Sequence, residues 1–389
     1  MKVAQVSFST SGGAGRVALN LNDELIRRNV DSRVISVTDK SLWESPFDAP
    51  GIALGSAIDE FVLKRRSSGS MLSIARNWSP KKINLEGFEI VHFHWWQGVD
   101  VNYLRSLSSD PGIVFTLHDE RAFTGGCHST NGCKKFQTGC VDCPILNPIF
   151  RHLATNEFAT TRNLFASMRK IVFTVPNAWM VEQAKLANLE EFGELVLVPN
   201  PIDNIFYKSS GRLSKAPKEE FVLGFVAQNL RDPNKQLDFA EYVIERLSNR
   251  GLRVRLRAVG NGKAIENSLV DYLGPLSSEE LINEAITWDG LISTSASETS
   301  PLVFFEMALL GLPVISTPNL GAIDTLATLG QKPLLPHSKE LLSEEHLKNL
   351  ISVVEEYRLN PPSRAHLDKH SLKNIASDML GIYERLEGD

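Results

Sequence analysis

The sequence has no long hydrophobic run, no excess of positive charge and no cysteine outside one short segment. Its apolar runs are shorter than the ~20 residues that span a bilayer, so we expect no transmembrane helix. Lys and Arg number 41 against 46 Asp and Glu, and the net charge of -5 gives no overall attraction for nucleic acid. Met1 and Lys2 lead directly into an apolar strand, without the long apolar core of a signal peptide. We therefore predict a cytoplasmic protein that does not bind nucleic acid.

The chain has the composition of an ordinary globular protein and is long enough for two domains. The 389 residues are 42% hydrophobic and 22% charged. Strand-like and helix-like patterns alternate along both halves, which predicts an α/β fold with parallel sheets wound on both sides. The polar, Lys-rich segment at 207–220 indicates a linker. We predict a first domain at residues 1–200, a second at 201–370 and a closing helix at 371–389.

The segment at 297–311 carries the clearest local pattern. Short apolar runs flank it on both sides and predict buried strands. Between them, Ser300 is suited to cap a helix, Pro301 to occupy its first position and Gly311 to end it. The segment therefore predicts a strand, a tight turn, a short helix and another strand.

The start of this predicted helix is suited to bind an anion. The free amides of Leu302 and Val303 would point out of the helix N-terminus, where phosphate is favoured. Glu298 lies in the preceding turn, and Glu306 lies five residues past Pro301, roughly 7–8 Å along the axis at 1.5 Å per residue. A nucleoside diphosphate sugar laid across the helix start can offer its sugar to one glutamate and its ribose to the other. The alternative is a surface helix with two ordinary carboxylates.

The spacing of Glu298 and Glu306, followed by the run at 308–315, resembles the signature of family-4 retaining glycosyltransferases, the glycosyl transferases group 1. The resemblance implies the GT-B fold, in which two doubly wound Rossmann-like domains face a cleft and the last helix crosses back to the first domain. It also implies that Glu298 contacts the transferred sugar and that Glu306 holds the ribose hydroxyls. It covers nearly the whole chain except residues 40–87.

A glycine-rich turn follows the first strand, before a helix expected from about Arg16. Such a turn lets backbone approach a ligand closely. Residues 13–18 fit the dinucleotide fingerprint G-x-G-x-x-A and Asp39 follows a second strand, a pattern typical of an NAD-dependent oxidoreductase. In the family resembled, a comparable loop, here with Gly12 and Gly13, faces the interdomain cleft near the donor phosphates and the acceptor. Glycines required only for packing are the third interpretation.

Histidines mark two neighbouring strands of the first half. His118 comes directly after the apolar run at 113–117, at the strand end where open α/β sheets bind ligands. The resemblance implies that His118 lies beside the transferred sugar, and a structural role is the alternative. His92 and His94 share one face of the preceding strand, which makes them candidates to line the acceptor side.

The cysteines cluster in an insert at 125–145 that is rich in Gly, Thr, Asn and Lys. A loop of this size cannot build its own core, and a cytosolic compartment disfavours disulfides. Four thiolates at such spacing suit a tetrahedral structural zinc site, with His128 as a substitute ligand. Disulfides, free thiols or an iron–sulfur cluster are the alternatives. A subset of capsule and exopolysaccharide glycosyltransferases has a similar insert, so within the family the chain resembles this subset in particular. The predicted zinc ligands are Cys127, Cys133, Cys140 and Cys143.

The second half contains the residues expected to hold the donor. In the family resembled, a Gly-Arg pair and a Lys clamp the diphosphate. Lys235 fits the lysine, but Gln228 stands where the family has Arg, and Arg231 is a nearby substitute. The turn that begins at Gly274 matches the base-binding turn of the family, whose backbone reads the nucleobase. The donor-binding residues predicted are Gly12, Gly13, Arg231, Lys235, Gly274, Leu276, Glu298, Ser300, Leu302, Val303 and Glu306.

Residues 58–82 mix large apolar side chains with six Lys or Arg. This mixture suits an anionic membrane surface. A Ser-Ser-Gly-Ser break at 67–70 argues against one continuous amphipathic helix, and a solvated helical hairpin is the alternative. We expect peripheral attachment at the inner face of the membrane.

We therefore predict a retaining glycosyltransferase of surface polysaccharide synthesis. It would move a sugar from a UDP- or GDP-linked donor to a saccharide acceptor that is attached to a lipid. Lys235 would stabilise the departing diphosphate, with His118 and Glu298 beside the sugar, and no catalytic metal is expected. Two alternatives remain, an NAD-dependent oxidoreductase and a catalytically inactive glycosyltransferase-like protein that binds glycans.

Overall fold

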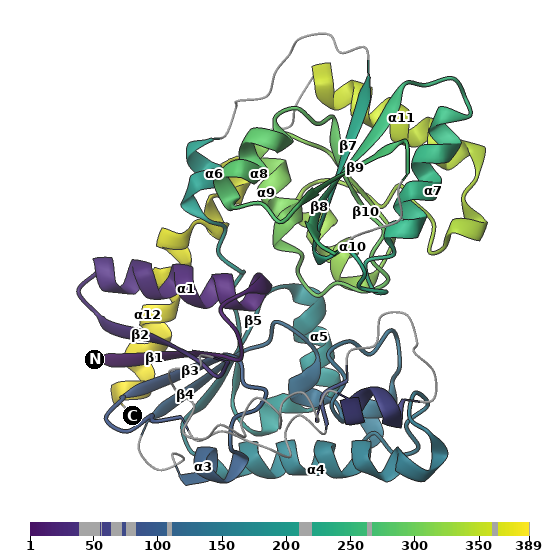
Figure 1. The fold of residues 1–389 in the computed structure, drawn as a ribbon. Helices are drawn as coiled ribbons and strands as arrows, with labels where there is room; N and C mark the ends of the chain where they lie inside the picture. The colour runs from purple at the N-terminus through teal and green to yellow at the C-terminus, as the bar shows by residue number, and fades with distance from the viewer. Residues whose placement is uncertain are drawn as a thin grey trace. The chain divides into compact units, whose positions relative to one another are not determined.

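The computed structural model describes residues 1–38, 55, 57–63, 72–74, 83–106, 111–209, 220–262, 267–359 and 365–388. The chain divides into two compact units, which Figure 1 colours from purple to yellow along the chain. Unit 1 consists of Met1–Pro201 together with Leu372–Asp389, and unit 2 consists of Ile202–Ser371. The chain therefore leaves unit 1 once and returns to it with its last helix.

Unit 1 is built on a parallel sheet with the strand order β2-β1-β3-β4-β5-β6. Val3 and Ile90 point into one hydrophobic layer, whereas Ala4 and Val91 point into the other, as the two-residue period of a strand requires. Because the strands are parallel, the loops after their carboxyl ends gather at one edge of the sheet. The strands are β1 (Lys2–Ser7), β2 (Asp31–Ser36), β3 (Ile90–Trp95), β4 (Gly112–Thr116), β5 (Ile171–Val175) and β6 (Glu194–Leu197).

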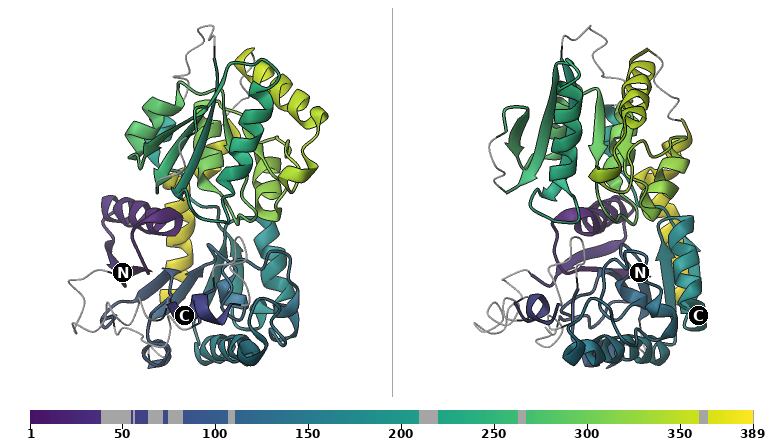
Figure 2. Two further views of the ribbon diagram at one scale, coloured as in Figure 1. Left: turned by 45° about the vertical axis from the view of Figure 1, so that its right-hand side comes forward. Right: turned by 90° about the vertical axis from the view of Figure 1, so that its right-hand side faces the viewer.

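Helices cover both faces of this sheet. Leu21 and Leu25 of α1 and Tyr383 of α12 fill one hydrophobic layer, and the other layer includes side chains of α4 and α5. A Cβ on Gly112 would lie 2.7 Å from the Cβ of Leu386, so this glycine lets α12 approach β4. Figure 1 and both views of Figure 2 show the yellow α12 within unit 1, although it ends the chain. The helices are α1 (Gly12–Arg27), α3 (Val101–Ser106), α4 (Arg151–Ser167), α5 (Ala178–Leu186) and α12 (Leu372–Gly388).

Unit 2 is built on a second parallel sheet, with the strand order β11-β10-β7-β8-β9. Leu256 of β8 packs in the hydrophobic cluster that contains α7, and Leu291 of β10 packs in the cluster that contains α9. A Cβ on Gly224 would lie 1.9 Å from the ring of Trp288, so only glycine fits under this side chain. The strands are β7 (Phe221–Asn229), β8 (Val254–Asn261), β9 (Val270–Gly274), β10 (Gly290–Ser293) and β11 (Val314–Ser316). The helices are α6 (Asn204–Lys208), α7 (Leu237–Ser248), α8 (Ser278–Ala285), α9 (Leu302–Leu310), α10 (Leu320–Thr328) and α11 (Glu344–Leu359).

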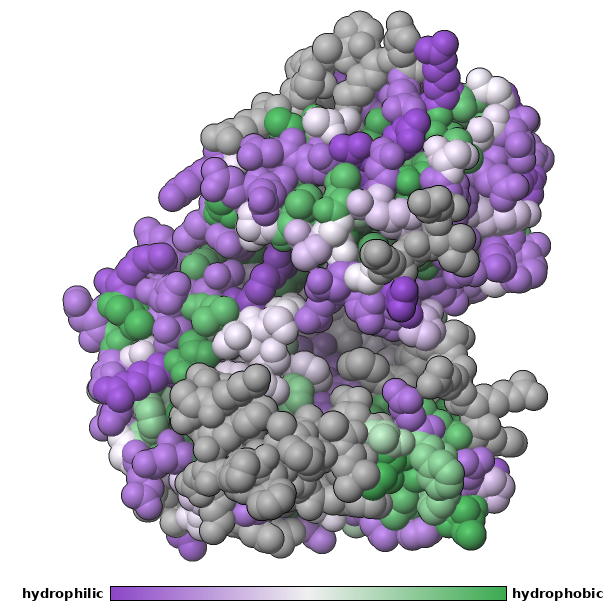
Figure 3. All heavy atoms as spheres, viewed as in Figure 1, coloured by the Kyte–Doolittle hydropathy of each residue, from purple (hydrophilic) through white to green (hydrophobic). Residues whose placement is uncertain are grey.

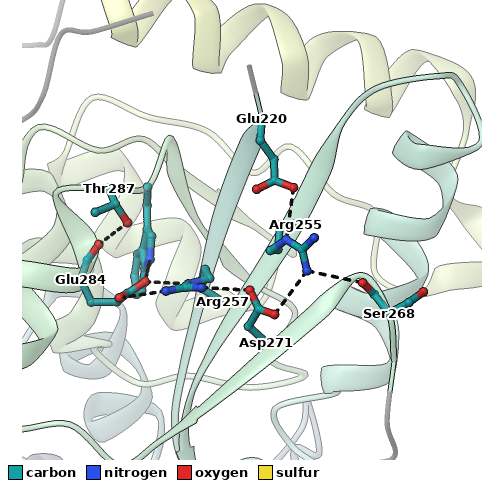
Figure 4. A network of polar contacts seen from close by, with 8 residues as sticks. Glu220, Arg255, Arg257, Ser268, Asp271, Glu284 and Thr287 are labelled. Carbon is teal, nitrogen blue, oxygen red and sulfur yellow. Dashed lines mark hydrogen bonds and ion pairs between the residues drawn. The ribbon is translucent and has the colours of Figure 1, made fainter. Parts of the chain in front are cut away.

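A network of ion pairs holds strand β9 against β8 and α8 (Figure 4). Arg257 places Nη1 2.9 Å from Asp271 Oδ2 on β9 and Nε 2.8 Å from Glu284 Oε1 on α8. Arg255 places Nη1 3.3 Å from Asp271 Oδ1 and Nε 3.1 Å from Glu220 Oε1. Each pair is partly exposed and contributes modestly by itself. Together they fix the position of β9 and of the turn that follows it.

The predicted fold class is confirmed, since both units have parallel sheets with alternating helices. One helix begins earlier than predicted, because α1 starts at Gly12 rather than near Arg16 and so includes the glycine-rich segment. Within the part of the chain that the structure describes, none of the helices has both the length and the hydropathy needed to cross a membrane.

Candidate active site

The predicted anion-binding helix start lies at the carboxyl edge of the unit 2 sheet, between β10 and α9. The first residue of α9 is Leu302, and the N-cap is Pro301 in an extended conformation with ψ of 106°. The prediction that Ser300 caps this helix and that Pro301 is its first residue is therefore wrong by one position. The fixed φ of proline suits either position, so only ψ decides between them. Gly311 ends the helix as predicted, with a left-handed φ of 91°.

Lys235 and Glu298 form an ion pair at this edge. Lys235 follows β7 and Glu298 follows β10, which are neighbouring strands, and Nζ lies 2.6 Å from Oε1. Burial alone would lower the pKa of Lys235, but the Glu298 carboxylate raises it above the ordinary value, so the amine is charged. Both side chains keep some exposure, 25% for Lys235 and 16% for Glu298. The structure thus brings these two predicted site residues together, close to the start of α9.

Three residues outside the predicted set of site residues hold the Glu298 turn in place. The side-chain amide of Asn234 donates to the Ser297 carbonyl at 2.9 Å and its oxygen accepts from the Ser297 N–H at 3.1 Å. Asn319 Oδ1 accepts from the Glu298 N–H at 3.1 Å. A Cβ on Gly321 would lie 1.9 Å from the Glu298 carbonyl oxygen, so glycine is required there. Asn234 directly precedes Lys235, and this adjacency is the signal that could have identified it.

Glu306 lies on α9 in a more enclosed position than Glu298. It is only 2% exposed, and Phe304 and Phe305 beside it are buried as well. Leu302 and Val303, in the first turn of the same helix, keep partial exposure. A ligand can therefore contact the first turn of α9 directly, whereas Glu306 is enclosed. The assignment of Glu306 to a ribose stays a prediction.

The remaining predicted donor-binding residues of unit 2 lie in turns after β7 and β9. Arg231 is exposed, and a Cβ on Gly262 would lie 3.4 Å from its Cγ. Gly274 ends β9 with φ of 74°, and a Cβ there would meet no atom within 4 Å. Leu276 is partly buried against the hydrophobic cluster that contains α9. The backbone at Gly274 is therefore open to a ligand.

The glycine-rich segment of unit 1 forms the first turn of α1. Gly12 has φ of 81°. A Cβ on Gly13 would meet no atom within 4 Å, whereas one on Gly15 would lie 2.5 Å from the Ser9 carbonyl oxygen. Packing therefore requires Gly15, and Gly13 leaves open space at a helix N-terminus. Asp39, on which the NAD interpretation also depends, lies outside the described residues.

His118 lies just after β4 and is partly exposed. Its Nε2 lies 3.1 Å from Nδ1 of His94, and Nε2 of His94 lies 2.7 Å from Oε1 of Gln5. Burial lowers the pKa of His118 to about 4 and that of His92 and His94 well below the ordinary value. His92 is 1% exposed and His94 3%, so the prediction that they line the acceptor side is wrong. They are interior residues, and His94 contacts His118 from within.

The four cysteines surround one cavity in the insert. This cavity has a volume of ≈ 20 Å³. All four thiols are free, so these cysteines form no disulfide bond in the structure. Burial raises the pKa of Cys127, and it raises that of Cys140 to about 11, so both favour the neutral thiol.

Over the described residues, no group of three or more His, Cys, Asp or Glu has the arrangement of a metal site. The donor chemistry fits zinc, whereas the sulfur positions are not those of a closed tetrahedral site. The residues that line the cavity include Cys127, Cys133, Cys140 and Cys143.

His128, the substitute zinc ligand, is engaged elsewhere. Its Nδ1 lies 2.5 Å from Asp119 Oδ2 and its Nε2 lies 2.6 Å from Ser73 Oγ. With both ring nitrogens bonded, His128 cannot be a ligand, and that prediction is wrong. The order Ser–His–Asp is that of a hydrolase triad, but Ser73 is 0% exposed and no substrate can reach it. These bonds instead tie the cysteine insert to the loop after β4 through Asp119 and to the segment 72–74 through Ser73.

The apolar part of the segment at 58–82 is largely interior. Val62, Leu72 and Ile74 are 2%, 4% and 2% exposed and belong to the hydrophobic core of unit 1. The prediction that the apolar residues of this segment face a membrane is therefore wrong for these three. Phe61 is 72% exposed. The basic residues of the segment lie outside the described residues.

Comparison with known proteins bears on the fold and on the family. No family model matches the sequence. The chain is 24% identical over 371 residues to WcaC of Escherichia coli K12, described as a colanic acid biosynthesis glycosyl transferase, and this covers 88% of this chain and 87% of that protein. Sucrose-phosphate synthase from Thermosynechococcus elongatus superposes with a TM-score of 0.67 at 12% identity over 99% of each chain. Anabaena HepE, solved with UDP and glucose, has a TM-score of 0.57 at 13% identity over 99% of this chain and 100% of its own.

These likenesses extend over nearly the whole chain and therefore include both units. The structural neighbours have the GT-B fold, as the chain was predicted to have.

Proposed function

We propose that this chain, a GT-B protein similar to the group 1 glycosyltransferases, is a retaining glycosyltransferase that transfers a sugar from a nucleoside diphosphate to a saccharide acceptor in polysaccharide synthesis. The observation that carries the proposal is the Lys235–Glu298 ion pair beside the start of α9. The name of the Escherichia coli relative and the UDP and glucose in the HepE structure support the substrate class.

In unit 2, a diphosphate is expected to lie at the first turn of α9. The amides of Leu302 and Val303 and the charged Lys235 are donors suited to its oxygens. When the diphosphate takes the amine of Lys235, Glu298 is released from the ion pair and becomes an acceptor for a sugar hydroxyl. Glu306 would then accept from the ribose hydroxyls, and the open backbone at Gly274 would contact the base.

The chemistry needs the departing diphosphate to be stabilised. In the transfer, the bond from the anomeric carbon to the diphosphate oxygen breaks and a bond to the acceptor hydroxyl oxygen forms on the same face. The acceptor proton passes to the leaving diphosphate. Lys235 and the α9 amides stabilise the charge that develops on that group, which is the kind of fixed electrostatic stabilisation that lowers a barrier most. No side chain here is assigned the part of a nucleophile, and no metal is assigned to the reaction.

In unit 1, His118 and the segment Gly12–Gly13 are expected to contact the sugar and the acceptor. His118 is partly exposed at the carboxyl end of β4, where ligands bind in open α/β sheets. The open space around Gly13 leaves room for a ligand group against the first turn of α1. An acceptor attached to a lipid would make the membrane attachment described below useful.

Nucleotide selectivity tests the proposal directly. The melting temperature of the protein is measured with UDP, GDP, ADP and NAD, each at the same concentration, because a ligand that binds only the folded state raises it. We expect UDP or GDP to raise it and NAD to leave it unchanged. A rise with NAD alone would instead establish the oxidoreductase alternative.

Turnover separates an enzyme from a glycan-binding protein. UDP- and GDP-sugars are incubated with the protein and an oligosaccharide acceptor, and the anomeric configuration of the product is read by NMR. Retention of the donor configuration is expected, and inversion would contradict the mechanism. Binding of nucleotide without hydrolysis or transfer on any acceptor would favour the inactive protein.

We also propose that the four cysteines bind one structural zinc ion. Support comes from the cavity that all four cysteines line and from the preference of zinc for sulfur ligands. Elemental analysis of protein purified without added metal should give one zinc per chain, and chelation should destabilise unit 1. A metal-free protein of full stability would exclude the site.

Finally, we propose that the protein is cytoplasmic and attaches through unit 1 to the inner face of the membrane. Phe61 is 72% exposed and Ile149 74%, and the ring of Phe61 contacts that of Phe150 at 5.9 Å between centroids. Figure 3 shows hydrophobic side chains gathered on part of the surface of unit 1. Lys64, Arg65 and Arg66 follow Phe61 in the sequence, and a basic residue near an anionic surface contributes about 1 kcal/mol.

Vesicle co-sedimentation tests the attachment. Anionic vesicles should bind more protein than neutral ones, and less at high salt. The double variant Phe61→Ser with Ile149→Ser should lose this binding, whereas Leu359→Ser, which removes a leucine 78% exposed in unit 2, should keep it. Equal binding to the two kinds of vesicle would refute the proposal.

A further inference from the structure

His118 is the partly exposed end of a continuous chain of hydrogen bonds that runs through unit 1. After His94 and Gln5, the chain continues from Gln5 Nε2 to the Tyr383 hydroxyl at 3.2 Å and from that hydroxyl to His92 Nδ1 at 2.7 Å. His92 Nε2 then lies 2.6 Å from Thr116 Oγ1, which lies 2.6 Å from Thr174 Oγ1. The members come from β1, β3, β5, α12 and the region of β4, so segments far apart in the sequence meet in it.

The orientation of the Gln5 amide determines the proton positions on one side. Its Oε1 can only accept, so the proton of His94 is on Nε2 and its Nδ1 is an acceptor. His118 must therefore donate from Nε2 to His94. The two ring centroids are 5.4 Å apart with the planes inclined by 20°, so the rings meet edge to edge, as an in-plane hydrogen bond requires. The proton of neutral His118 is then on Nε2, and Nδ1 keeps its lone pair.

The same amide determines the proton positions on the other side. Gln5 Nε2 donates to the Tyr383 oxygen, so the hydroxyl proton of Tyr383 is directed to His92 Nδ1. His92 then donates from Nε2 to Thr116, whose hydroxyl shares a hydrogen bond with that of Thr174. From His118 to Thr116, all the protons point in one direction.

The surroundings keep the chain neutral. Gln5 and Tyr383 are 0% exposed, and His92 and His94 are nearly as buried. Burial lowers the pKa of all three imidazoles, and their mutual repulsion lowers that of His92 and His94 further. The charged group next to His118 is Asp119, which opposes this effect on His118 without reversing it. A charged His118 would keep its donation from Nε2 to His94, but its Nδ1 would carry a proton and could no longer accept a hydrogen bond.

We propose that His94, Gln5 and Tyr383 are positioning residues that hold His118 as the neutral Nε2–H tautomer, so that Nδ1 accepts a hydrogen bond from a sugar hydroxyl. The described part of the chain supplies no hydrogen-bond partner for Nδ1 of His118. The proposal rests on the proposed function only for the identity of the ligand as a sugar. A hydroxyl is recognised by such an acceptor, whereas a phosphate, which also accepts, is not. The C-terminal helix thereby influences the site through Tyr383.

The tautomer of His118 is measured in the whole protein by two-bond ¹H–¹⁵N correlation NMR of ¹⁵N-histidine-labelled material, with His118→Asn for the assignment. At pH 7.5, the Nε2–H pattern is expected. An Nδ1–H pattern or an imidazolium pattern would overturn the proposal. This measurement needs no activity, so its failure is distinct from failure of the proposed transfer reaction.

The variant Tyr383→Phe tests the far part of the chain. Loss of the hydroxyl leaves Gln5 free to turn its amide, and the His118 signals should move toward a mixture of tautomers. The affinity for the sugar nucleotide should fall about tenfold, while that for the free nucleoside diphosphate stays within about twofold. A purely structural effect would lower both affinities equally and leave the tautomer as it is, and either result would contradict the proposal.

Tyr103→Phe is the matched control. It removes a partly buried tyrosine hydroxyl of the same unit, which accepts one bond from the Leu85 N–H at 2.9 Å and takes no part in the chain. It should change neither the tautomer nor the ratio of the two affinities. His94→Phe is a second test, because it removes the acceptor itself and should abolish the Nε2–H preference of His118.

Discussion

The carboxyl edges of the two sheets carry opposite kinds of chemistry on the same kind of scaffold. At the unit 1 edge, His118 ends a chain of buried groups that burial keeps neutral. At the unit 2 edge, Lys235 and Glu298 are partly exposed and form an ion pair. Parallel strands place loop residues at the edge in both units, so the scaffold alone does not decide what is bound. The difference teaches that burial and partners set the chemistry of each edge, a neutral imidazole in one unit and a charged pair in the other.

The largest expected effect comes from removing the charge at the unit 2 edge. Lys235→Ala should lower kcat/KM for transfer about 100- to 1000-fold, because a fixed donor to the departing group is lost and Glu298 is left without its partner. Lys339→Ala is the control, since it breaks a comparable pair with Asp238, 2.8 Å long, at the surface of the same unit. A loss below tenfold would show that the unit 2 edge does not act through this charge.

The second effect is on stability in acid and concerns unit 1. The pKa of His118 is lowered from 6.5 to about 4 on folding, so below pH 6.5 the unfolded chain binds more protons than the folded one. Stability from His118 is therefore present above pH 6.5 and is lost as the pH falls toward 4, by about 2 kcal/mol at pH 5.

His118→Asn should remove this loss. Hydrogen exchange of the intact protein at pH 7.5 and 5, corrected for intrinsic rates, measures it, and peptides of unit 2 serve as the internal control. An acid response of unit 1 that is identical in the wild type and the variant would disprove the neutral character of the site.

The third effect distinguishes the two glutamates of unit 2. Glu306→Gln should raise the dissociation constant of the nucleoside diphosphate about tenfold, because a charged acceptor for a hydroxyl is lost while the buried shape is kept. Glu298→Gln should leave this constant nearly unchanged and lower transfer instead. Calorimetric titration of both variants decides the matter, and equal affinities for the wild type and Glu306→Gln would remove the ribose assignment.

The smallest effect concerns the ion pairs that hold β9. Arg257→Ala loses its bonds to Asp271 and Glu284 and should reduce the free energy of unfolding by about 1 kcal/mol. Nucleotide affinity should fall only about two- to threefold, through the turn after β9. Arg246→Ala, which breaks a pair with Glu344 between α7 and α11, should affect stability alone. Unchanged affinity in both variants would mean that β9 does not contribute to binding the base.

The strands and helices of both units were predictable because their signals are local. An apolar run between turn residues predicts a buried strand, and β4 is found where the run at 113–117 lies. The contacts that make the sites were not predictable in this way. Lys235 and Glu298 are 63 positions apart and Gln5 and Tyr383 are 378 apart, and no local pattern reports such a pair.

The errors have physical causes of the same kind. A strand with His92 and His94 on one face predicts a common side but not whether that side is covered, and here it lies inside unit 1. Apolar residues beside basic ones fit a membrane surface and a core equally well, and Leu72 is in the core. His128 has the chemistry of a ligand, but only the fold shows that Asp119 and Ser73 occupy both its nitrogens.

The placement of α12 has a consequence for the time course of synthesis. Residues of β1, β3 and β4 emerge early from the ribosome, yet α12, which covers one face of their sheet, is made after all of unit 2. At roughly 5–20 residues per second, the about 170 residues between take on the order of 10–30 s. Throughout that interval the hydrophobic layer around Val3, Ile90 and Val114 lacks part of its cover on the nascent chain. Unit 2 is continuous in sequence, so all of its residues are available once Ser371 has been added. Unit 1 is begun first during synthesis but can complete its fold only after α12 has been made.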